Sequence, residues 1–390
     1  MNSKKLNIPL VKDTIDGDDI KRLIGWLETE PRLTKGEKTI EFEKKWSKWL
    51  GVKHSVFVNS GSSANLAMIY ALLLSGKLKN DKIVVPSLSW VTTVSPIINF
   101  NLEPILCDSD KDTLSIDLIH LEKIFIEHNP SALLLVHPLG FPNDMDNIQK
   151  MCDKYNVIVL EDSCETIGTK YNDKLMGSFG LMSSFSFYFG HHISTIEGGM
   201  ISTNDDDLYK IILSIRSHGW DRDLPESEQK KLRSKYNIDN FHSLYTFYHP
   251  GFNLRSTDLQ AYIGISQIDK LEYIGKKREE NLKLYDKYIK NDYWKIKILD
   301  NSFISNFAYP IIHPNIIKIH DELKENGVET RPLICGSIAN QPFWIERYGQ
   351  VEIPFADEIH KHGMYLPNNP TITEEEIIEI SKIVNKYTSN

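Results

Sequence analysis

The sequence of 390 residues contains only four cysteines, and no two of them have the two-residue spacing of a zinc or redox motif. We therefore expect no metal site and no iron–sulfur cluster built on these thiols. No stretch reaches the roughly 18 apolar residues that a membrane span requires. Because no apolar segment follows the first seven residues, the N-terminus is not typical of a secretory signal. We expect a cytoplasmic protein that has no membrane partner.

Basic residues are also fewer than acidic residues. The sequence contains 45 Lys and Arg against 53 Asp and Glu, which gives a net charge of −8. A general nucleic-acid binder needs a basic surface, so this class is excluded, whereas a local pocket for a phosphorylated small molecule is not. The chain has no internal repeats or low-complexity tracts. Its 41% apolar, 25% charged and 10% aromatic residues are typical of a globular protein and argue against disorder.

Short apolar runs alternate with helical patterns through the first two-thirds of the chain, which predicts an α/β fold with a mostly parallel sheet. The predicted strands are residues 55–58, 82–85, 132–136, 157–160, 183–187 and 199–203, and two of the predicted helices are 64–74 and 145–155. Most of these runs are continuously apolar, as in strands that are buried on both faces. In such sheets, ligands bind beyond the carboxyl ends of the strands.

A helical pattern from Asp258 to about Tyr288 leads into a smaller α+β part, whose last helix has Thr371 or Thr373 as its N-cap. We predict a large domain of residues 1–265 and a small domain of residues 266–390. Residues 221–242 form a charged stretch with little periodicity. This stretch is interpreted as a surface loop or, alternatively, as a mobile flap over a site.

Four local patterns could carry chemistry. Residues 60–65 (SGSSAN) follow a strand and open a helix, which suits either a phosphate site or a plain N-cap. Residues 161–165 (EDSCE) end the strongest buried strand, where Asp162 could hold a cation or cap the next helix. Trp90 follows another strand end and could lie in the core or cover a flat ring. Residues 184–199 contain His191 and His192, and a neutral imidazole near a cofactor could act as a general base.

Together, and in this order along nearly the whole chain, these motifs resemble those of the DegT/DnrJ/EryC1/StrS sugar aminotransferase family. The runs Gly251-Phe-Asn253-Leu-Arg255 and Gly327-Val-Glu-Thr-Arg331-Pro complete the pattern. The resemblance implies the fold-type-I, aspartate aminotransferase-like fold of enzymes that use pyridoxal 5′-phosphate.

The resemblance also assigns roles to single residues. Gly61, Ser62 and Ser186 would hold the cofactor phosphate, and Trp90 would stack on the pyridine ring. Asp162 would pair with the ring nitrogen and keep the ring an electron sink. Asn253 resembles the residue that reaches the cofactor phosphate of a neighbouring subunit, which implies a homodimer with shared sites.

One position departs from the aminotransferases of the family. They carry a lysine five residues after the phosphate-binding serine and six before the glutamate of Glu-Gly-Gly, and both counts lead here to His191. No lysine occurs between Lys174 and Lys210. Because imidazole forms no stable covalent bond to the cofactor aldehyde, the cofactor would be held non-covalently, with pyridoxamine 5′-phosphate as its working form.

Histidine at this position is similar to the sugar 3-dehydratases of the family, and most to the metal-free kind that acts on GDP-4-keto-6-deoxymannose. That kind shares Glu165, assigned to the cofactor site, and the run containing His218 and Arg222. The resemblance implies that L-glutamate donates the amino group and that His191 is the base. The products would be ammonia and a GDP-4-keto-3,6-dideoxy sugar for a bacterial surface polysaccharide.

Several alternatives stay open. His218 could be a second catalytic residue or an ordinary buried histidine. Arg222 is assigned to substrate, and Arg331 to the substrate phosphate or to the glutamate carboxylate. The sugar could be the mannose-derived hexose or a 6-deoxy-4-keto heptose. Two other functions compete: a nucleotide-sugar aminotransferase, which needs the missing lysine, and a non-catalytic binding or regulatory protein, which would not need the other motif residues.

Overall fold

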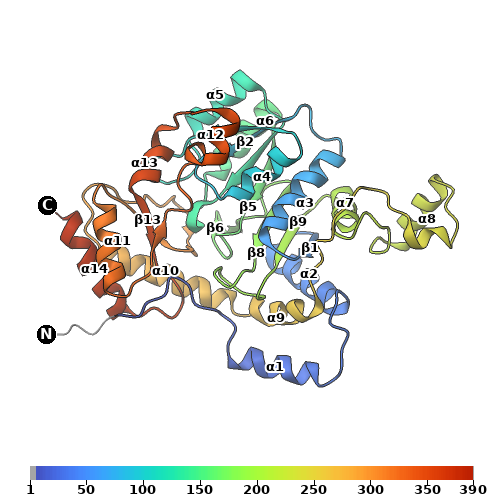
Figure 1. The fold of residues 1–390 in the computed structure, drawn as a ribbon, viewed down its shortest axis with the longest axis horizontal. Coiled ribbons are helices and arrows are strands. Elements are labelled where there is room, and N and C mark those ends of the chain that lie inside the picture. The colour runs from blue at the N-terminus through green and yellow to red at the C-terminus, as the bar shows by residue number, and fades with distance from the viewer. Residues whose placement is uncertain (1–5, 390) are drawn as a thin grey trace.

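The computed structural model describes residues 6–389, which form a large central sheet covered by helices on both faces (Figure 1). The seven strands, in spatial order, are β1 (His54–Val58), β9 (Gly199–Thr203), β8 (Met182–Ser186), β5 (Ile158–Asp162), β4 (Ala132–Val136), β2 (Lys82–Pro86) and β3 (Glu103–Cys107). The five strands from β8 to β3 are parallel, and β9 pairs antiparallel with both of its neighbours. The predicted mostly parallel sheet and all six predicted strands are confirmed.

Fourteen α-helices and three short 3-10 helices are found within the described residues. The α-helices are α1 (Gly17–Leu27), α2 (Glu37–Leu50), α3 (Gly61–Leu74), α4 (Val91–Asn99), α5 (Leu118–His128), α6 (Met145–Tyr155), α7 (Asp206–Arg216), α8 (Glu226–Lys235), α9 (Asp258–Ile268), α10 (Leu271–Tyr288), α11 (Ile316–Glu325), α12 (Pro342–Tyr348), α13 (Pro354–His362) and α14 (Glu374–Thr388). The 3-10 helices are η1 (Pro138–Gly140), η2 (His242–Tyr245) and η3 (Ile338–Asn340). None of the helices in this part of the chain is both long and apolar enough to cross a membrane.

The continuous apolar runs of the strands have a direct structural cause. In β4, Ala132 and Leu134 pack into the cluster on the α3 and α4 side, while Leu133 and Leu135 pack into the cluster on the α5 and α6 side. Both faces of the sheet are therefore buried, and the ligand-facing residues lie at the carboxyl ends of the strands. This arrangement gathers the chemistry at one edge of the sheet.

The C-terminal part is built on a small antiparallel sheet of β11 (Tyr309–Ile312), β13 (Gly363–Leu366) and β12 (Arg331–Pro332). A third sheet joins β10 (Ser302–Phe303), β6 (Lys170–Tyr171) and β7 (Lys174–Leu175). Thr373 caps α14 through a capping box, as predicted. The apolar cluster of this part also takes in Ile8, Leu139 and Phe141, so the boundary between residues 265 and 266 stays a prediction.

Two predictions of local structure were wrong. The helix expected from Asp258 to Tyr288 is two helices, because Asp269 and Lys270 form a tight turn that is closed by bonds from their N–H groups to the carbonyls of Ser266 and Gln267. Residues 221–248, named here the arm, contain α8 and η2 rather than only a loop. Helix α8 buries no residue, so its sequence lacks the apolar periodicity that would have revealed it.

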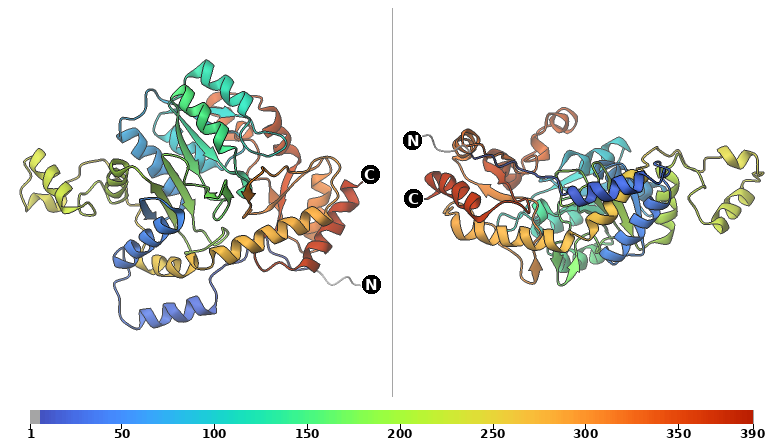
Figure 2. Two further views of the ribbon diagram at one scale, coloured as in Figure 1. Left: turned by 180° about the vertical axis from the view of Figure 1, so that it is seen from behind. Right: turned by 90° about the horizontal axis from the view of Figure 1, so that it is seen from below.

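The arm also does not cover this chain's own pocket. Figures 1 and 2 show α8 standing out from the body of the molecule, beyond α7 and away from the C-terminal part. None of its residues lines the cavity described below. The flap hypothesis is therefore wrong for the chain taken by itself.

Candidate active site

A cavity of about 210 Å³ lies where the carboxyl ends of β4, β5 and β8 meet the N-termini of α3 and α4. Its lining includes seven of the predicted site residues, namely Gly61, Ser62, Trp90, Asp162, Glu165, Ser186 and His191. The other lining residues are Asn65, Thr92, Thr93, Val136, Cys164, Phe307, Ile334 and Tyr365. Parallel strands end at the same sheet edge, which explains how residues more than 100 positions apart meet here.

Asp162, the last residue of β5, is a buried carboxylate at the wall of this cavity. Its Oδ2 accepts hydrogen bonds from Asn65 Nδ2 at 2.7 Å and from Thr93 Oγ1 at 2.8 Å. The amide of Asn65 is fixed in turn, because its Oδ1 accepts from Ser184 Oγ at 2.5 Å. No Lys, Arg or His within residues 6–389 forms an ion pair with it. A buried anion with fixed neutral donors and no cation suits a cationic group of a ligand.

The start of α3 is shaped for close approach to a ligand. Ser60 is the N-cap, and its Oγ accepts from Ser63 N at 3.0 Å, so the alternative that this run caps a helix also holds. A Cβ at Gly61 would lie 2.6 Å from Ser186 Cβ and 3.1 Å from Cys164 Sγ, so only glycine fits between the strand end and the helix. The first-turn N–H groups and the hydroxyls of Ser62 and Ser186 therefore surround one corner of the cavity, which suits an anion such as phosphate.

Trp90 is not a core residue. It precedes α4, lines the cavity and is 54% exposed. Of the two alternatives for this residue, the core position is therefore excluded. The indole is free to cover the face of a planar ligand.

His191 lies in the loop between β8 and β9, which comprises residues 187–198 and is named here the base loop. Its imidazole lines the cavity and packs on Phe307, with the ring centroids 5.3 Å apart. Within the described residues Nδ1 is buried and has no hydrogen-bond partner. Burial lowers the pKa of His191 to about 4, an effect that Asp162 opposes and Arg278 strengthens. The ring is therefore neutral at neutral pH and can accept a proton.

The neighbouring histidine has a different environment. His192 is fully buried outside the cavity, and its Nε2 lies 2.7 Å from the carbonyl oxygen of Ser305. Burial also lowers the pKa of His192 well below its ordinary value. His192 therefore anchors the base loop to the segment that carries Phe307 rather than facing a ligand.

Two glutamates at the carboxyl end of β5 differ in burial and in their hydrogen bonds, since Glu161 is fully buried and Glu165 is half-buried. Glu161 faces His137 and accepts from the N–H groups of Gly177, Phe179 and Gly180, and these contacts outweigh burial and lower its pKa. Within residues 6–389, Glu165 accepts a hydrogen bond only from Leu139 N, at 2.7 Å, and burial raises its pKa to about 7. Glu161 is structurally satisfied, whereas Glu165 faces the cavity with capacity to donate or accept a proton.

Four predicted site residues do not line the cavity, and three of them lie around the base of the arm. His218 has a φ of +63° and packs against Trp220, with the ring centroids 4.9 Å apart. Arg222 lies 4.0 Å from the centroid of the Trp220 ring and donates to the carbonyl oxygen of Leu244 within the arm. Asn253 is exposed and lies on a bridge with Ser217. These residues gather around the base of the arm, on a surface rather than in this chain's pocket.

Arg331 lies at the edge of the pocket. It pairs with Tyr365 across the small sheet, and Tyr365 lines the cavity. Its guanidinium is 52% exposed and contacts Glu329 Oε1 at 3.3 Å. Arg331 can therefore contact a ligand that extends out of the cavity.

Eight lining residues were not predicted from the sequence, and four of them shape the site. Asn65 and Thr93 hold Asp162, and Phe307 and Tyr365 bring aromatic surface from the C-terminal part. Asn65 was part of the quoted run at residues 60–65, and its polar side chain in an otherwise apolar helix was a usable signal. Phe307 and Tyr365 gave no such signal.

Comparison with known proteins places this geometry in a family. A model of the DegT/DnrJ/EryC1/StrS aminotransferase family matches residues 13–385. The chain belongs to this family. It is 34% identical over 400 residues, covering 99% of this chain and all of the relative, to the GDP-4-keto-6-deoxy-D-mannose 3-dehydratase of Yersinia pseudotuberculosis.

Solved structures of the family agree with the fold described here. An E. coli GDP-4-keto-6-deoxy-D-mannose-3-dehydratase with bound hydrated PLP superposes with a TM-score of 0.89 at 32% identity, covering 98% of this chain and all of that one. A GDP-4-keto-6-deoxymannose-3-dehydratase with a trapped PLP-glutamate geminal diamine gives 0.88 at 31% identity, covering 97% and 100%. The predicted family and its aminotransferase-like fold are confirmed.

The residues that line the cavity fit a pyridoxal phosphate cofactor. Asp162 matches a protonated ring nitrogen, the corner at Gly61 matches a phosphate, and Trp90 matches a ring face. Among residues 6–389, no three His, Cys, Asp or Glu side chains lie together as ligands for a metal ion.

Proposed function

We propose that this protein is a pyridoxal phosphate-dependent 3-dehydratase of a GDP-4-keto-6-deoxy sugar, with L-glutamate as amino donor. The observation that carries the proposal is His191. It occupies the position of the lysine in aminotransferases of the family, its ring lines the cavity that contains Asp162, and burial keeps it neutral. A neutral base without a covalent tether favours removal of a proton and elimination over transfer of an amine to the sugar.

The cofactor, when bound, supplies an electron sink for the sugar carbon skeleton. Asp162 holds the ring nitrogen in its protonated form, and Gly61, Ser62 and Ser186 hold the phosphate. Trp90 covers the open face of the ring. Because Glu165 has a pKa of about 7, it can share a proton with a ring substituent.

In the sugar step, His191 would take up the proton of the C–H bond whose electron pair expels the C3 hydroxyl, and it could return that proton to the departing oxygen. The overall change converts glutamate and the GDP-4-keto-6-deoxy sugar into 2-oxoglutarate, ammonia and the GDP-4-keto-3,6-dideoxy sugar. The substrate is the mannose-derived hexose or a 6-deoxy heptose of the same pattern. Arg331 at the pocket edge binds an anionic group of the sugar nucleotide or of glutamate.

We also propose that the active unit is a homodimer. Asn253, His218 and Arg222 lie on a surface outside this chain's cavity, and the arm that begins beside them exposes Phe241, Tyr245 and Phe247. A two-fold related copy would bring these residues to the other subunit's site. They are assigned to the cofactor phosphate and the sugar nucleotide of the partner.

Borohydride reduction separates this function from that of an aminotransferase. The protein is incubated with pyridoxal phosphate alone, reduced and measured by intact mass. We expect the unmodified mass, since no lysine lines the cavity. Attachment of one cofactor to a lysine would overturn the proposal, and failure to bind the cofactor at all would favour a non-catalytic protein.

A further inference from the structure

The segment before and at the start of α1 runs along the base loop. Residues 8–19, named here the strap, begin on the C-terminal part, where Ile8 forms a parallel bridge with Val328 and Leu10 N donates to Glu329 Oε2 at 3.0 Å. Figure 1 shows this segment passing from the side of the C-terminal part to α1 below the large sheet. The strap therefore leads from the C-terminal part to α1 and on its way passes the base loop, which carries His191.

The strap lies beside the base loop before His191 and is hydrogen-bonded to the loop after His191. A Cβ at Gly190 would lie 3.6 Å from Val11 Cγ1, so the strap lies in van der Waals range of the residue before His191. Thr14 Oγ1 accepts a hydrogen bond from Ser194 N at 3.1 Å. Ser194 is fully buried, and its Oγ accepts from Ile196 N at 3.0 Å, so this contact also fixes the far side of the loop.

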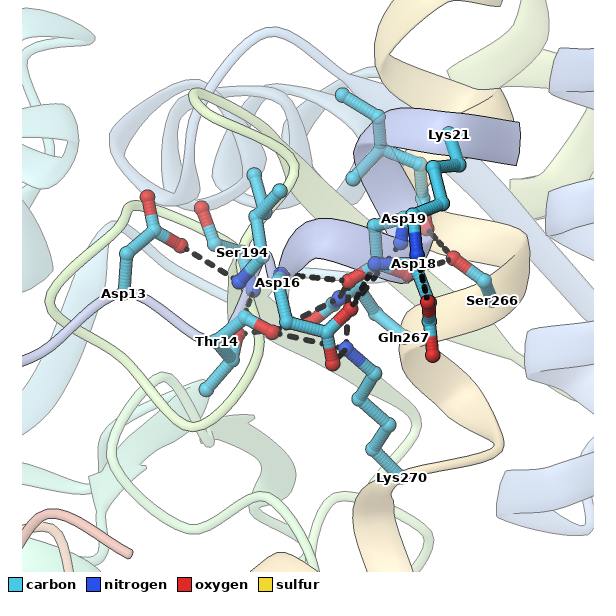
Figure 3. A network of polar contacts seen from close by, with 12 residues as sticks. Asp13, Thr14, Asp16, Asp18, Asp19, Lys21, Ser194, Ser266, Gln267 and Lys270 are labelled. Carbon is cyan, nitrogen blue, oxygen red and sulfur yellow. Dashed lines mark hydrogen bonds and ion pairs between the residues drawn. The ribbon is translucent and has the colours of Figure 1, made fainter. Parts of the chain in front are cut away.

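Thr14 is itself held from behind, as Figure 3 shows. Its Oγ1 donates to Gln267 Oε1 at 2.6 Å, and its carbonyl oxygen accepts from Gln267 Nε2 at 3.2 Å and Lys270 Nζ at 3.0 Å. Gln267 and Lys270 both donate to Asp19 Oδ2, at 2.7 and 2.5 Å. The turn between α9 and α10 therefore provides a rigid support for one hydroxyl.

We propose that Thr14 is a positioning residue for His191, because its hydroxyl connects the base loop to the support formed by Gln267, Lys270 and Asp19. This inference rests on the proposed function of His191 as the base. Nδ1 of His191 has no hydrogen-bond partner among the described residues, so the orientation of the ring depends on the loop backbone and on Phe307. Misplacement of a reacting group by about 1 Å can cost about 100-fold in rate, which makes such a support consequential.

The test compares Thr14→Val, which keeps the side-chain shape, with Thr14→Ser, which keeps the hydroxyl. For Thr14→Val we expect kcat to fall by about 10-fold while KM for the sugar nucleotide and the affinity for pyridoxal phosphate stay unchanged. Hydrogen exchange of the Ser194 amide, measured without any substrate, should become at least about 10-fold faster, as expected for loss of its acceptor. Thr14→Ser should restore both values.

Thr29→Val is the matched control. Thr29 follows the C-terminal end of α1, and within the described residues its hydroxyl bonds only to the carbonyl of Trp26. It should leave kcat and exchange unchanged. If Thr14→Val does not fold, Gln267→Met removes the support instead and should produce the same pattern. Unchanged exchange at Ser194, or a loss of cofactor binding that parallels the loss of kcat, would overturn the inference. If the wild-type protein converts no sugar, the proposed function fails, and the exchange measurement still decides whether Thr14 holds the loop.

Discussion

The cavity wall and the surface around the base of the arm both contain predicted site residues, but the surroundings of these residues differ. At the wall, Asp162 and His191 face an open space, with neutral donors around the carboxylate and no hydrogen-bond partner, among the described residues, for the imidazole Nδ1. At the arm, Arg222 and His218 pack against Trp220 and face no cavity of their own chain. The wall gathers a carboxylate and an imidazole around one cavity, whereas Arg222 and His218 do not line it.

The difference follows from how each region is built. The wall collects the ends of parallel strands, so its residues converge whatever lies outside the chain. The arm stands out from the body (Figure 2) and exposes aromatic side chains that a monomer has no reason to expose. In the proposed homodimer, these residues would reach the site of the other subunit.

The largest effect is expected from His191→Asn, which removes the base and keeps a polar side chain of similar reach. We expect turnover of the sugar to fall by about 10²–10⁴-fold, the usual contribution of a general base. Affinity for pyridoxal phosphate should stay within about 2-fold, since the other cofactor residues are intact. Steady-state kinetics and equilibrium titration measure the two quantities.

His128→Asn, at the end of α5 and far from the cavity, is the control for this change. It should leave turnover unaltered. Undiminished turnover in His191→Asn would show that His191 is not the base. The contrast between the cavity wall and the arm would then have no catalytic meaning.

Asp162→Ala should produce the next largest effect, this time on binding. Loss of a buried charged partner costs about 3–5 kcal/mol, so affinity for pyridoxal phosphate should fall by about 100-fold or more. Asp207→Ala removes a carboxylate that is exposed on α7 and should change nothing. Equal affinities for the two variants would show that the carboxylate of Asp162 does not hold the cofactor.

The wall was largely predictable from the sequence, and the reason is local. The buried runs, the glycine and serines after β1 and the two counts that meet at His191 all lie within a few residues of a strand end. Phe307 and Tyr365 were not predictable, because they reach the cavity only through the packing of the C-terminal part against residues more than 100 positions away. Helix α8 in the arm was not predicted for a different reason. Because it buries no residue, its sequence has no periodic apolar face.

A mixing experiment tests whether Asn253, which lies beside the base of the arm, completes the site of the partner subunit. Asn253→Ala should lower turnover by about 10-fold, the loss expected for one charge-assisted hydrogen bond to the cofactor phosphate. When His191→Asn and Asn253→Ala subunits are co-expressed, mixed dimers contain one intact site, so about a quarter of wild-type turnover should return. Recovery no greater than the sum of the separate variants would show that each chain works alone.

The smallest effect concerns Glu165 and pH. Burial raises the pKa of Glu165 to about 7, so the folded protein retains this proton at pH values where the unfolded chain has lost it. Its contribution to stability is present at acidic pH and is lost as the pH rises toward 7. The Tm of the wild-type protein should therefore fall more between pH 5 and 8 than that of Glu165→Gln, by a few degrees in thermal unfolding. Identical pH dependence in the two proteins would mean that Glu165 is ionised throughout.

The proposed dehydratase function is tested most directly by finding which product carries the nitrogen of glutamate in one incubation. The protein is mixed with pyridoxal phosphate, L-glutamate and GDP-4-keto-6-deoxymannose, and ammonia and product mass are followed together. We predict ammonia release in step with a sugar nucleotide that has lost its C3 hydroxyl oxygen. If 2-oxoglutarate forms while the sugar is untouched, the heptose substrate is the next to be tested. An amino sugar formed without ammonia would contradict the assignment of His191 and make the protein an aminotransferase.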